Sequence, residues 1–126
     1  MHAAVNDRGH PMTLKLTAGQ CGDAPHAADL LAGHRPRVVI ADRGYDSDAI
    51  VGRVREMGAE AVIPPLKCRT VLRPYDRVAY RRRNVVERFW SKAKQSRRVA
   101  TRYDKLDVCY LAFVHLASVL VVLRHP

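Results

Sequence analysis

The 126-residue sequence lacks the features that mark disulfide-rich, zinc-binding and membrane-spanning proteins. Its three cysteines, Cys21, Cys68 and Cys109, form no C-x-x-C pair and are odd in number. This argues against a disulfide framework and a zinc knuckle, so three reduced, partly buried thiols are expected. No apolar stretch follows Met1, so no secretory signal is expected. The longest apolar run, 108–123, falls short of the roughly 20 residues that span a bilayer, which predicts a buried core helix instead.

Acidic residues are scarce in the second half of the chain. Residues 1–66 carry seven basic and eight acidic side chains, a net charge of −1, whereas residues 67–126 carry fifteen basic and four acidic ones, a net of +11. Such a concentrated positive field predicts a polyanionic partner, and a surface kept basic for solubility is the alternative. The length suits one domain, and an apolar content of 48% excludes wholesale disorder.

The first third of the chain predicts a hairpin followed by a short helix. Residues 2–5 and 12–17 have strand character and flank 6–11, a segment rich in turn-forming residues. A helix is predicted from about 24 to 32, with Asp23 as its N-cap. Gly33 follows at the position where glycine commonly ends a helix.

The middle of the chain predicts a pair of parallel strands. Residues 37–42 form a continuous apolar run that ends in Asp42, and such a run is typical of a strand buried on both faces. A helix over 47–57, capped by Ser47, and a strand over 61–63 follow. Strand, helix and strand with short connections make a right-handed crossover unit, which requires the two strands to be parallel.

The rest of the chain predicts a loop and two helices. Residues 66–76 are basic and show no clear hydrophobic period, which indicates a mobile loop. One helix is expected over 78–96 and a second over 105–123. No internal repeat or low-complexity tract interrupts these elements.

Asp42 is the first candidate for chemistry. Open α/β sheets keep their sites at the carboxyl ends of parallel strands, and Asp42 stands at such an end. An aspartate before a tight turn also caps that turn by accepting hydrogen bonds from backbone N–H groups. The spacing to Gly44 fits this structural role equally well, so both interpretations stay open.

The basic helix carries the second candidate. In an α-helix, the spacing of Tyr80, Arg83, Glu87 and Lys94 places all four within about 60° of one another. Glu87 is the only acid in 78–101, an odd position if the charge served solubility alone. An Arg83–Glu87 salt bridge, worth about 0.3–0.5 kcal/mol on an exposed helix, is compatible with either role. The opposite, apolar arc is expected to pack on the sheet and consists of Val86, Phe89, Ala93 and Ala100.

Four segments together resemble a known family. They are Ala-Asp-Arg-Gly-Tyr-Asp at 41–46, Val-Ile-Pro-Pro at 62–65, Val-Glu-Arg-Phe at 86–89 and the basic stretch 97–105. The sequence is similar to bacterial insertion-sequence transposases of the DDE type, closest to insertion-sequence family five. The family's Y-R-E-K signature is matched at Tyr80, Arg83, Glu87 and Lys94. The resemblance covers the chain from residue 2 to 123.

This resemblance implies an α/β fold and a catalytic role for two acids. The implied fold is RNase H-like, with a mixed sheet of the opening hairpin and two parallel strands, packed by helices. Asp42 would be the second acid of the catalytic triad and Glu87 the third. Both would bind Mg²⁺ or Mn²⁺, since hard cations prefer carboxylate oxygens, and a metal pair promotes in-line phosphoryl displacement. Residues 1–126 would then form a partial catalytic domain with 66–76 as its mobile loop.

The same resemblance implies a DNA partner, the terminal inverted repeats of an insertion sequence. Tyr80, Arg83 and Lys94 would hold phosphates near the cut strand. Further arginines would supply the salt-dependent, sequence-independent part of DNA affinity. They are Arg81, Arg88, Arg97, Arg98 and Arg102. Trp90 could stack on a base, but its helical position beside the apolar arc favours packing. The resemblance further implies a bacterial protein of the cytoplasm that associates with the nucleoid. No membrane association is expected.

The resemblance also indicates what the 126 residues lack. In the family the first catalytic aspartate lies on a strand upstream of the opening hairpin, and that strand is central to the sheet. Asp7, the only acid in the first twenty residues, falls in the predicted turn, where a solvated role is expected. An incomplete fold without the central strand would leave two strand edges open to pairing. The expected partners are therefore an upstream transposase segment and a second copy on DNA.

Alternatives from other classes remain at this point. The chain could be the downstream frame of a split element or a truncated relic. It could also be a non-catalytic DNA-binding fragment that regulates transposition by masking transposon ends. A general RNase H-like nuclease is a weaker alternative, because the Y-R-E-K face belongs to transposition.

The missing first aspartate predicts that the 126 residues alone bind DNA weakly and do not cleave it. Mg²⁺-dependent cleavage of an inverted-repeat end, assayed with and without the upstream segment supplied fused or in trans, tests this expectation. Cleavage by the 126 residues alone would contradict it.

Overall fold

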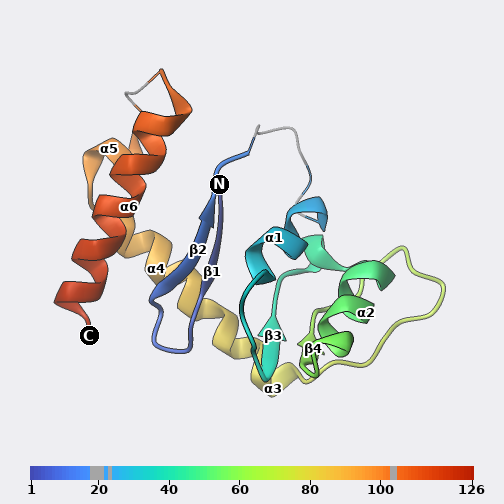
Figure 1. Ribbon diagram of the computed structural model, residues 1–126. Coiled ribbons are helices and arrows are strands. Elements are labelled where there is room, and N and C mark those ends of the chain that lie inside the picture. The colour runs from blue at the N-terminus through green and yellow to red at the C-terminus, as the bar shows by residue number, and fades with distance from the viewer. Residues whose placement is uncertain (18–21, 23, 103–104) are drawn as a thin grey trace. The chain divides into compact units, whose positions relative to one another are not determined.

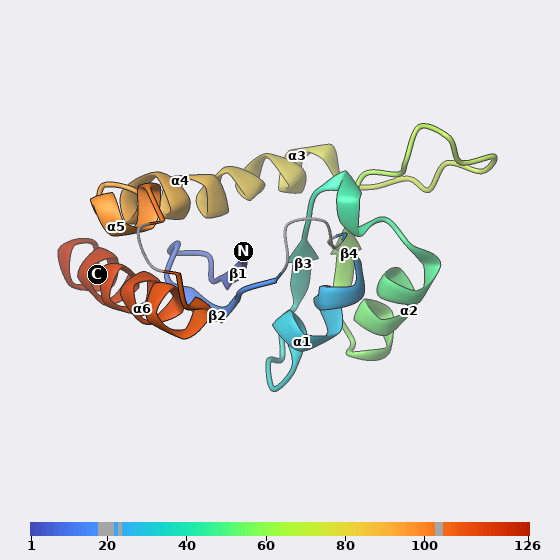
Figure 2. The ribbon, with the colours of Figure 1, turned by 90° about the horizontal axis from the view of Figure 1, so that it is seen from above.

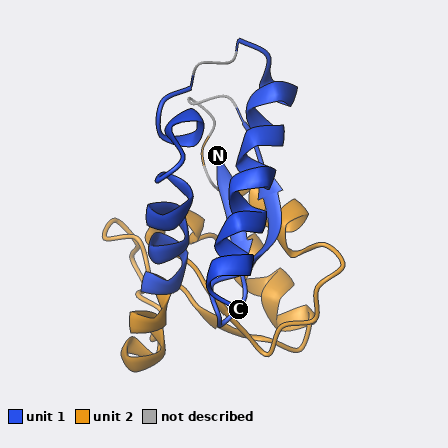
Figure 3. Ribbon diagram, turned by 90° about the vertical axis from the view of Figure 1, so that its left-hand side faces the viewer, with its two compact units in different colours: residues 1–19, 84–126 blue, residues 20–83 orange. Residues whose placement is uncertain are grey.

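A computed structural model describes residues 1–17, 22, 24–102 and 105–126. Cys21 and the predicted cap Asp23 therefore lie outside the described residues. The chain divides into two compact units, which Figure 3 colours separately. Unit 1 comprises residues 1–19 and 84–126, and unit 2 comprises residues 20–83.

The predicted hairpin opens unit 1. Strand β1 (His2–Val5) pairs antiparallel with β2 (Pro11–Lys15). Asn6 organises the turn between them, because its side-chain Oδ1 accepts the N–H groups of Arg8 at 3.0 Å and His10 at 2.9 Å. Gly9 in this turn has φ +82°, a conformation that glycine adopts without steric cost.

Three helices complete unit 1: α4 (Asn84–Ala93), α5 (Arg97–Ala100) and α6 (Asp107–Arg124). Helix α4 contacts β1 and α6, and α5 contacts α6 (Figure 1). The Tyr110 hydroxyl on α6 donates to the Val99 carbonyl of α5 at 3.0 Å, which fixes the two helices together. The buried core lies between these elements and consists of Phe89, Ala93, Val99, Val114, Ala117 and Val121.

Helix α6 is not the buried core helix that its sequence predicted. Only 22% of its residues are buried, and Leu116, Val119 and Leu123 are exposed on the side away from the core. A helix packed on one side by a hairpin and two short helices buries one stripe only. By length and composition α6 could cross a membrane, a test that the core helix of a soluble protein also passes.

The prediction of partly buried thiols is wrong for Cys68 and Cys109, which are exposed.

The long helix predicted over 78–96 is broken into shorter pieces. Helix α3 (Arg77–Tyr80) is followed by the 3₁₀ turn η3 (Arg81–Arg83) and then by α4, which ends at Ala93. Helix α5 starts a new helical phase at Arg97. As a result Val99 is buried and Ala100 is exposed, which corrects the predicted apolar arc.

Unit 2 contains the predicted crossover. Its parallel strands β3 (Val38–Ile40) and β4 (Glu60–Val62) are connected by η2 (Arg43–Tyr45) and α2 (Asp48–Glu56), as Figures 1 and 2 show. The Ser47 hydroxyl caps α2 by accepting the Ile50 N–H at 3.1 Å. Before β3 come η1 (Ala24–His26) and α1 (Ala27–Leu31). The core joins α1, α2 and the strands through Ala27, Ile50, Val51, Val54, Ala59 and Ile63.

Two expectations for the sheet are wrong for the described residues. The hairpin and the parallel pair form two separate two-stranded sheets, not one mixed sheet. No described strand pairs with both β1 and β3, so nothing joins them into one ladder. Strand β3 is also not buried on both faces, since Val38 is 42% exposed and Val39 is half-buried. The described elements of unit 2 therefore bury only part of the apolar surface of β3.

Residues 63–76, between β4 and α3, contain no helix or strand, as the lack of periodicity predicted. Asp76 ends this loop and caps α3, because its Oδ1 accepts the N–H groups of Val78 at 2.9 Å and Ala79 at 3.0 Å. The sequence leaves regular structure at Ile63, where two prolines follow that cannot donate to a strand ladder.

The one-sided packing of α6 predicts that two valine truncations on this helix differ in cost. Val114 is fully buried and Val119 is 54% exposed. We expect Val114→Ala to lower the free energy of unfolding by about 2 kcal/mol and Val119→Ala by less than about 0.5 kcal/mol. Urea unfolding followed by fluorescence of Trp90, the only tryptophan, measures both in unit 1. Equal losses would contradict the assigned core face.

Candidate functional site

Asp42 lies two residues beyond β3, at the start of η2. Its Oδ1 accepts the Gly44 N–H at 2.9 Å and its carbonyl accepts the Tyr45 N–H at 3.1 Å. The turn-capping role that the sequence left open is therefore present. A carboxylate has about four acceptor directions, so one N–H bond leaves capacity for a cation. The half-buried side chain keeps part of this capacity accessible to solvent.

Glu87 lies in the first turn of α4, in unit 1. Phe89 and Ala93 face the core from the same helix, whereas Glu87 is exposed. Its carboxylate is therefore directed to solvent and not into the core of unit 1.

The 3₁₀ turn η3 changes the predicted face of four residues. In a 3₁₀ helix, side chains three residues apart lie directly above one another. Tyr80 and Arg83 follow this rule, with the guanidinium carbon 6.0 Å from the centre of the Tyr80 ring. The Tyr75 ring packs edge-on against Tyr80, with ring centres 5.7 Å apart. This group belongs to unit 2.

The other two residues of the predicted face belong to unit 1. Glu87 and Lys94 are both exposed and are separated by about two helical turns. Lys94 follows the last residue of α4, and its N–H still donates to the Trp90 carbonyl at 2.9 Å. Of the four residues, Tyr80 and Arg83 are thus in contact, and Glu87 and Lys94 are exposed about two turns apart.

The five other predicted DNA-contacting arginines are exposed, and two of them are supported by aromatic rings. The Arg98 guanidinium carbon lies 4.4 Å from the centre of the Phe113 ring, and that of Arg102 lies 5.0 Å from the Tyr110 ring. Arg102 also forms an ion pair with Asp107. Cation–π contact holds a guanidinium in place without neutralising it, so phosphate can still bind. The remaining exposed arginines of this set are Arg81, Arg88 and Arg97.

Trp90 serves packing, as its position in the sequence favoured. It is half-buried against the core of unit 1, and its ring centre lies 5.0 Å from that of Phe89. Stacking of this ring on a base is therefore not needed to explain its position.

Sequence reasoning missed a buried charge cluster in unit 2. The carboxylate of Asp46 contacts Arg69 and Arg73, and Arg69 also contacts Asp48. Arg69 stands 23 residues after Asp46 and lies in a loop without periodicity, so no motif or spacing links them. The only signal in the sequence is a pair of arginines four residues apart. In the structure these two are half-buried, whereas the loop residues 66–68 and 70–72 around them are exposed.

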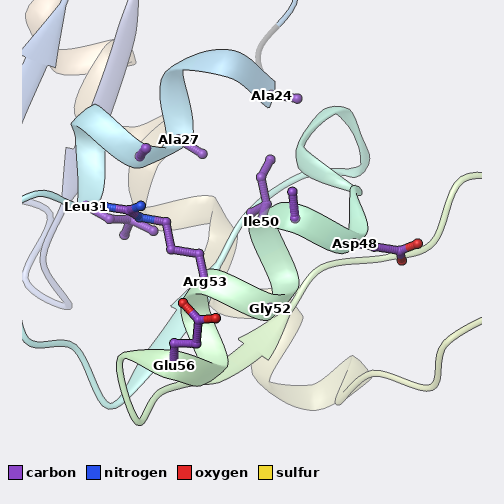
Figure 4. A pocket seen from close by; sticks show the side chains of 10 residues that line it. Ala24, Ala27, Leu31, Asp48, Ile50, Gly52, Arg53 and Glu56 are labelled. Carbon is purple, nitrogen blue, oxygen red and sulfur yellow. The ribbon is translucent and has the colours of Figure 1, made fainter.

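A cleft of about 540 Å³ lies between α1 and α2 in unit 2. Figure 4 shows its lining, in which small apolar side chains dominate and Arg53 extends toward Leu31. None of the residues predicted from the sequence to bind metal or DNA lines this cleft. The cleft therefore adds nothing to the candidate site.

The two predicted metal ligands are not gathered into a metal site by the described residues alone. Within that part of the chain, no group of three or more His, Cys, Asp or Glu side chains is placed to hold a metal ion. Asp42 belongs to unit 2 and Glu87 to unit 1. The donor chemistry of both fits Mg²⁺ or Mn²⁺, since carboxylate oxygens are the ligands that hard cations prefer.

Comparison with known proteins identifies the class. Residues 1–122 match the family described as the transposase DDE domain. The chain is 36% identical over 126 residues to a candidate transposase for insertion sequence element IS6501 from Brucella ovis, covering 98% of this chain and 97% of that protein. It is 32% identical over 132 residues to a candidate transposase for insertion sequence element IS402 from Burkholderia cepacia, covering 95% of this chain and 60% of that protein. No solved structure matches the chain.

The chain therefore belongs to the transposase DDE domain family. Proteins with this domain generally use divalent metal ions and act on DNA. The mixed α/β structure, with its small sheets and surrounding helices, is consistent with such a domain.

The exposed arginines predict how DNA affinity depends on salt. Arg88 is exposed on α4, and Arg55 is exposed on α2, outside the basic segment 81–102. We expect Arg88→Gln to weaken binding to any duplex and to reduce the slope of log K against log salt concentration by about 1. Arg55→Gln is the matched control and should leave the slope unchanged. Fluorescence anisotropy across a salt series measures both, and equal effects would remove Arg88 from the interface.

Proposed function

We propose that this chain supplies two carboxylates, Asp42 and Glu87, to the metal site of a transposase that cleaves and joins DNA strands at the ends of an insertion sequence. The observation that carries the proposal is an exposed acid, Glu87, on a helix that also exposes Arg88 and is followed by Lys94, in a chain of the transposase DDE domain family. Relatives that match over this length are named for the same activity.

Each residue has a role that follows from its surroundings. The Gly44 N–H holds one oxygen of Asp42, which orients the carboxylate and leaves its other lone pairs for a cation. Glu87 presents its carboxylate to solvent from a rigid helix. Bound Mg²⁺ or Mn²⁺ supplies the charge that stabilises the attacking and leaving oxygens of an in-line phosphoryl displacement.

The basic residues position the DNA strand. Tyr80 and Arg83 stack on one another, so the guanidinium is preorganised to meet a phosphate. Lys94 and Arg88 are exposed on or just beyond the helix that carries Glu87. Further along the chain, Arg97, Arg98 and Arg102 add sequence-independent affinity. These contacts bring phosphate toward an acidic site that would otherwise repel it.

A third carboxylate is expected from a segment outside these 126 residues. The two acids alone fall short of the three that the resemblance implies, and no third acid joins either of them in the described residues. Strands β1 and β3 each pair on one edge only there, so either can accept a further strand. An upstream transposase segment fits both needs, and a second copy of the chain on the DNA is compatible with them.

The second candidate is a DNA-binding protein without chemistry, such as a regulator that masks transposon ends. The two functions differ in what Glu87 does, because only the enzyme needs its charge for cleavage.

Glu87→Gln separates the two functions in a form of the protein that carries the upstream segment. We expect Mg²⁺-dependent cleavage of an inverted-repeat end to fall by at least about a hundredfold, because a metal ligand stabilises the transition state by several kcal/mol. Affinity for the same DNA should stay equal or rise, since a negative charge is removed.

Two further variants complete this test. Asp42→Asn keeps an acceptor for the Gly44 N–H and removes the charge, so it should fold normally and lose cleavage to the same extent. Glu56→Gln changes an exposed acid of α2 and is the control that should leave cleavage unaffected. Full cleavage by Glu87→Gln would refute the enzymatic role of this residue.

A further inference from the structure

Asp46 is the one acidic side chain that is buried among the described residues, with a side-chain exposure of 0%. A buried carboxylate is stable only when donors replace the water it has lost. Its Oδ2 accepts the Leu66 N–H at 2.7 Å and the Arg69 Nε–H at 2.6 Å. Its Oδ1 forms an ion pair with Arg73. All three partners come from the loop between β4 and α3.

The two arginines are committed to this cluster. The side chains of Arg69 and Arg73 are only 22% and 20% exposed, although the rest of the loop between residues 66 and 73 is exposed. Removing the shared anion would leave the partly buried Arg73 without its counter-charge and Arg69 with only the exposed Asp48, which is unfavourable. These two charges therefore hold the loop on the protein, and the loop's contribution to DNA attraction is correspondingly smaller than its composition indicates.

The anchor is attached to the turn that carries Asp42. Asp42 caps the start of η2 and Asp46 closes its end, with the Asp46 N–H donating to the Arg43 carbonyl at 3.0 Å. The turn has three residues, so it leaves little freedom between its two aspartates. The Ser47 hydroxyl then starts α2 directly after Asp46. The position of the Asp46 carboxylate thus constrains the backbone on which Asp42 stands.

We propose that Asp46 is a positioning residue that anchors the loop 63–76 to η2 and thereby holds the Asp42 carboxylate in place. The metal-binding part of this statement rests on the function proposed above for Asp42, and the anchoring part does not. The sequence predicted that residues 66–76 are mobile. With both arginines held by Asp46, this mobility is confined to the exposed residues 70–72 between them.

Hydrogen exchange of the Leu66 amide measures directly whether Asp46 holds the loop. Its only partner among the described residues is the Asp46 carboxylate, in a loop without secondary structure. Hydrogen exchange followed by NMR in the 126-residue chain should show this amide protected. Asp46→Asn should raise its exchange rate at least tenfold, while the amide of the buried residue Val54 in α2 keeps its protection.

Asp48→Asn is the matched control. Asp48 also accepts from Arg69, at 3.0 Å, but its side chain is 83% exposed, so its loss should change Leu66 exchange less than twofold. If Asp46→Asn unfolds unit 2 and Val54 loses protection as well, Arg69→Gln decides, because it keeps the buried anion and removes one anchor. Leu66 exchange must then rise while Val54 stays protected. An unprotected Leu66 amide in the native chain, or no response to these variants, would overturn the anchor.

Cleavage tests the positioning role separately. In the form of the protein that carries the upstream segment, Asp46→Asn should lower the Mg²⁺-dependent kcat at least tenfold, while DNA affinity stays equal or rises because a negative charge beside two arginines is removed. Loss of the anchor with unchanged kcat would overturn the positioning role. If the native protein does not cleave at all, the proposed function fails while the exchange result still decides the anchor.

Discussion

A two-stranded sheet cannot hold itself together in water, and this constraint governs both units of the protein. In unit 1 the hairpin is stable only because α4 and α6 bury Phe89, Val114 and their neighbours against it. In unit 2 the parallel pair depends on α1 and α2 around Val54. Each helix thus has one face assigned to packing, and its other face is available for charge. The exposure of Glu87 and Arg88 on α4 is a direct consequence.

The charge of the chain is used in two different ways. Arginines of the segment 81–102 are exposed, and stacking of Arg98 and Arg102 on aromatic rings fixes them without removing their charge. The loop arginines Arg69 and Arg73 are instead half-buried and paired with the buried Asp46, and Arg69 also with Asp48. Net charge alone does not separate the two groups. The burial of their side chains does, and it directs the expected DNA contact to the exposed segment around Glu87.

Local signals predicted much of the fold. Turn residues predicted the hairpin, Ser47 predicted the start of α2, and the crossover predicted the parallel pairing of β3 and β4. Predictions of how deeply an element is buried were wrong in two places, because periodicity does not say what covers a helix or strand. This explains the exposed face of α6 and the exposed Val38 of β3. The break at Arg81–Arg83 has no glycine or proline to mark it. The Asp46 cluster joins distant residues by charge alone, which no spacing reveals.

The central proposal is that the carboxylates of Asp42 and Glu87 both bind divalent metal in a transposase. It is tested most directly by replacing Mg²⁺ with Fe²⁺ in the protein that carries the upstream segment and generating hydroxyl radicals, which cut the backbone beside the bound metal. The account predicts cuts near residues 42 and 87, both suppressed by excess Mg²⁺ and both lost in Glu87→Gln. Cuts near only one of the two residues, or cuts that persist in Glu87→Gln, would contradict it.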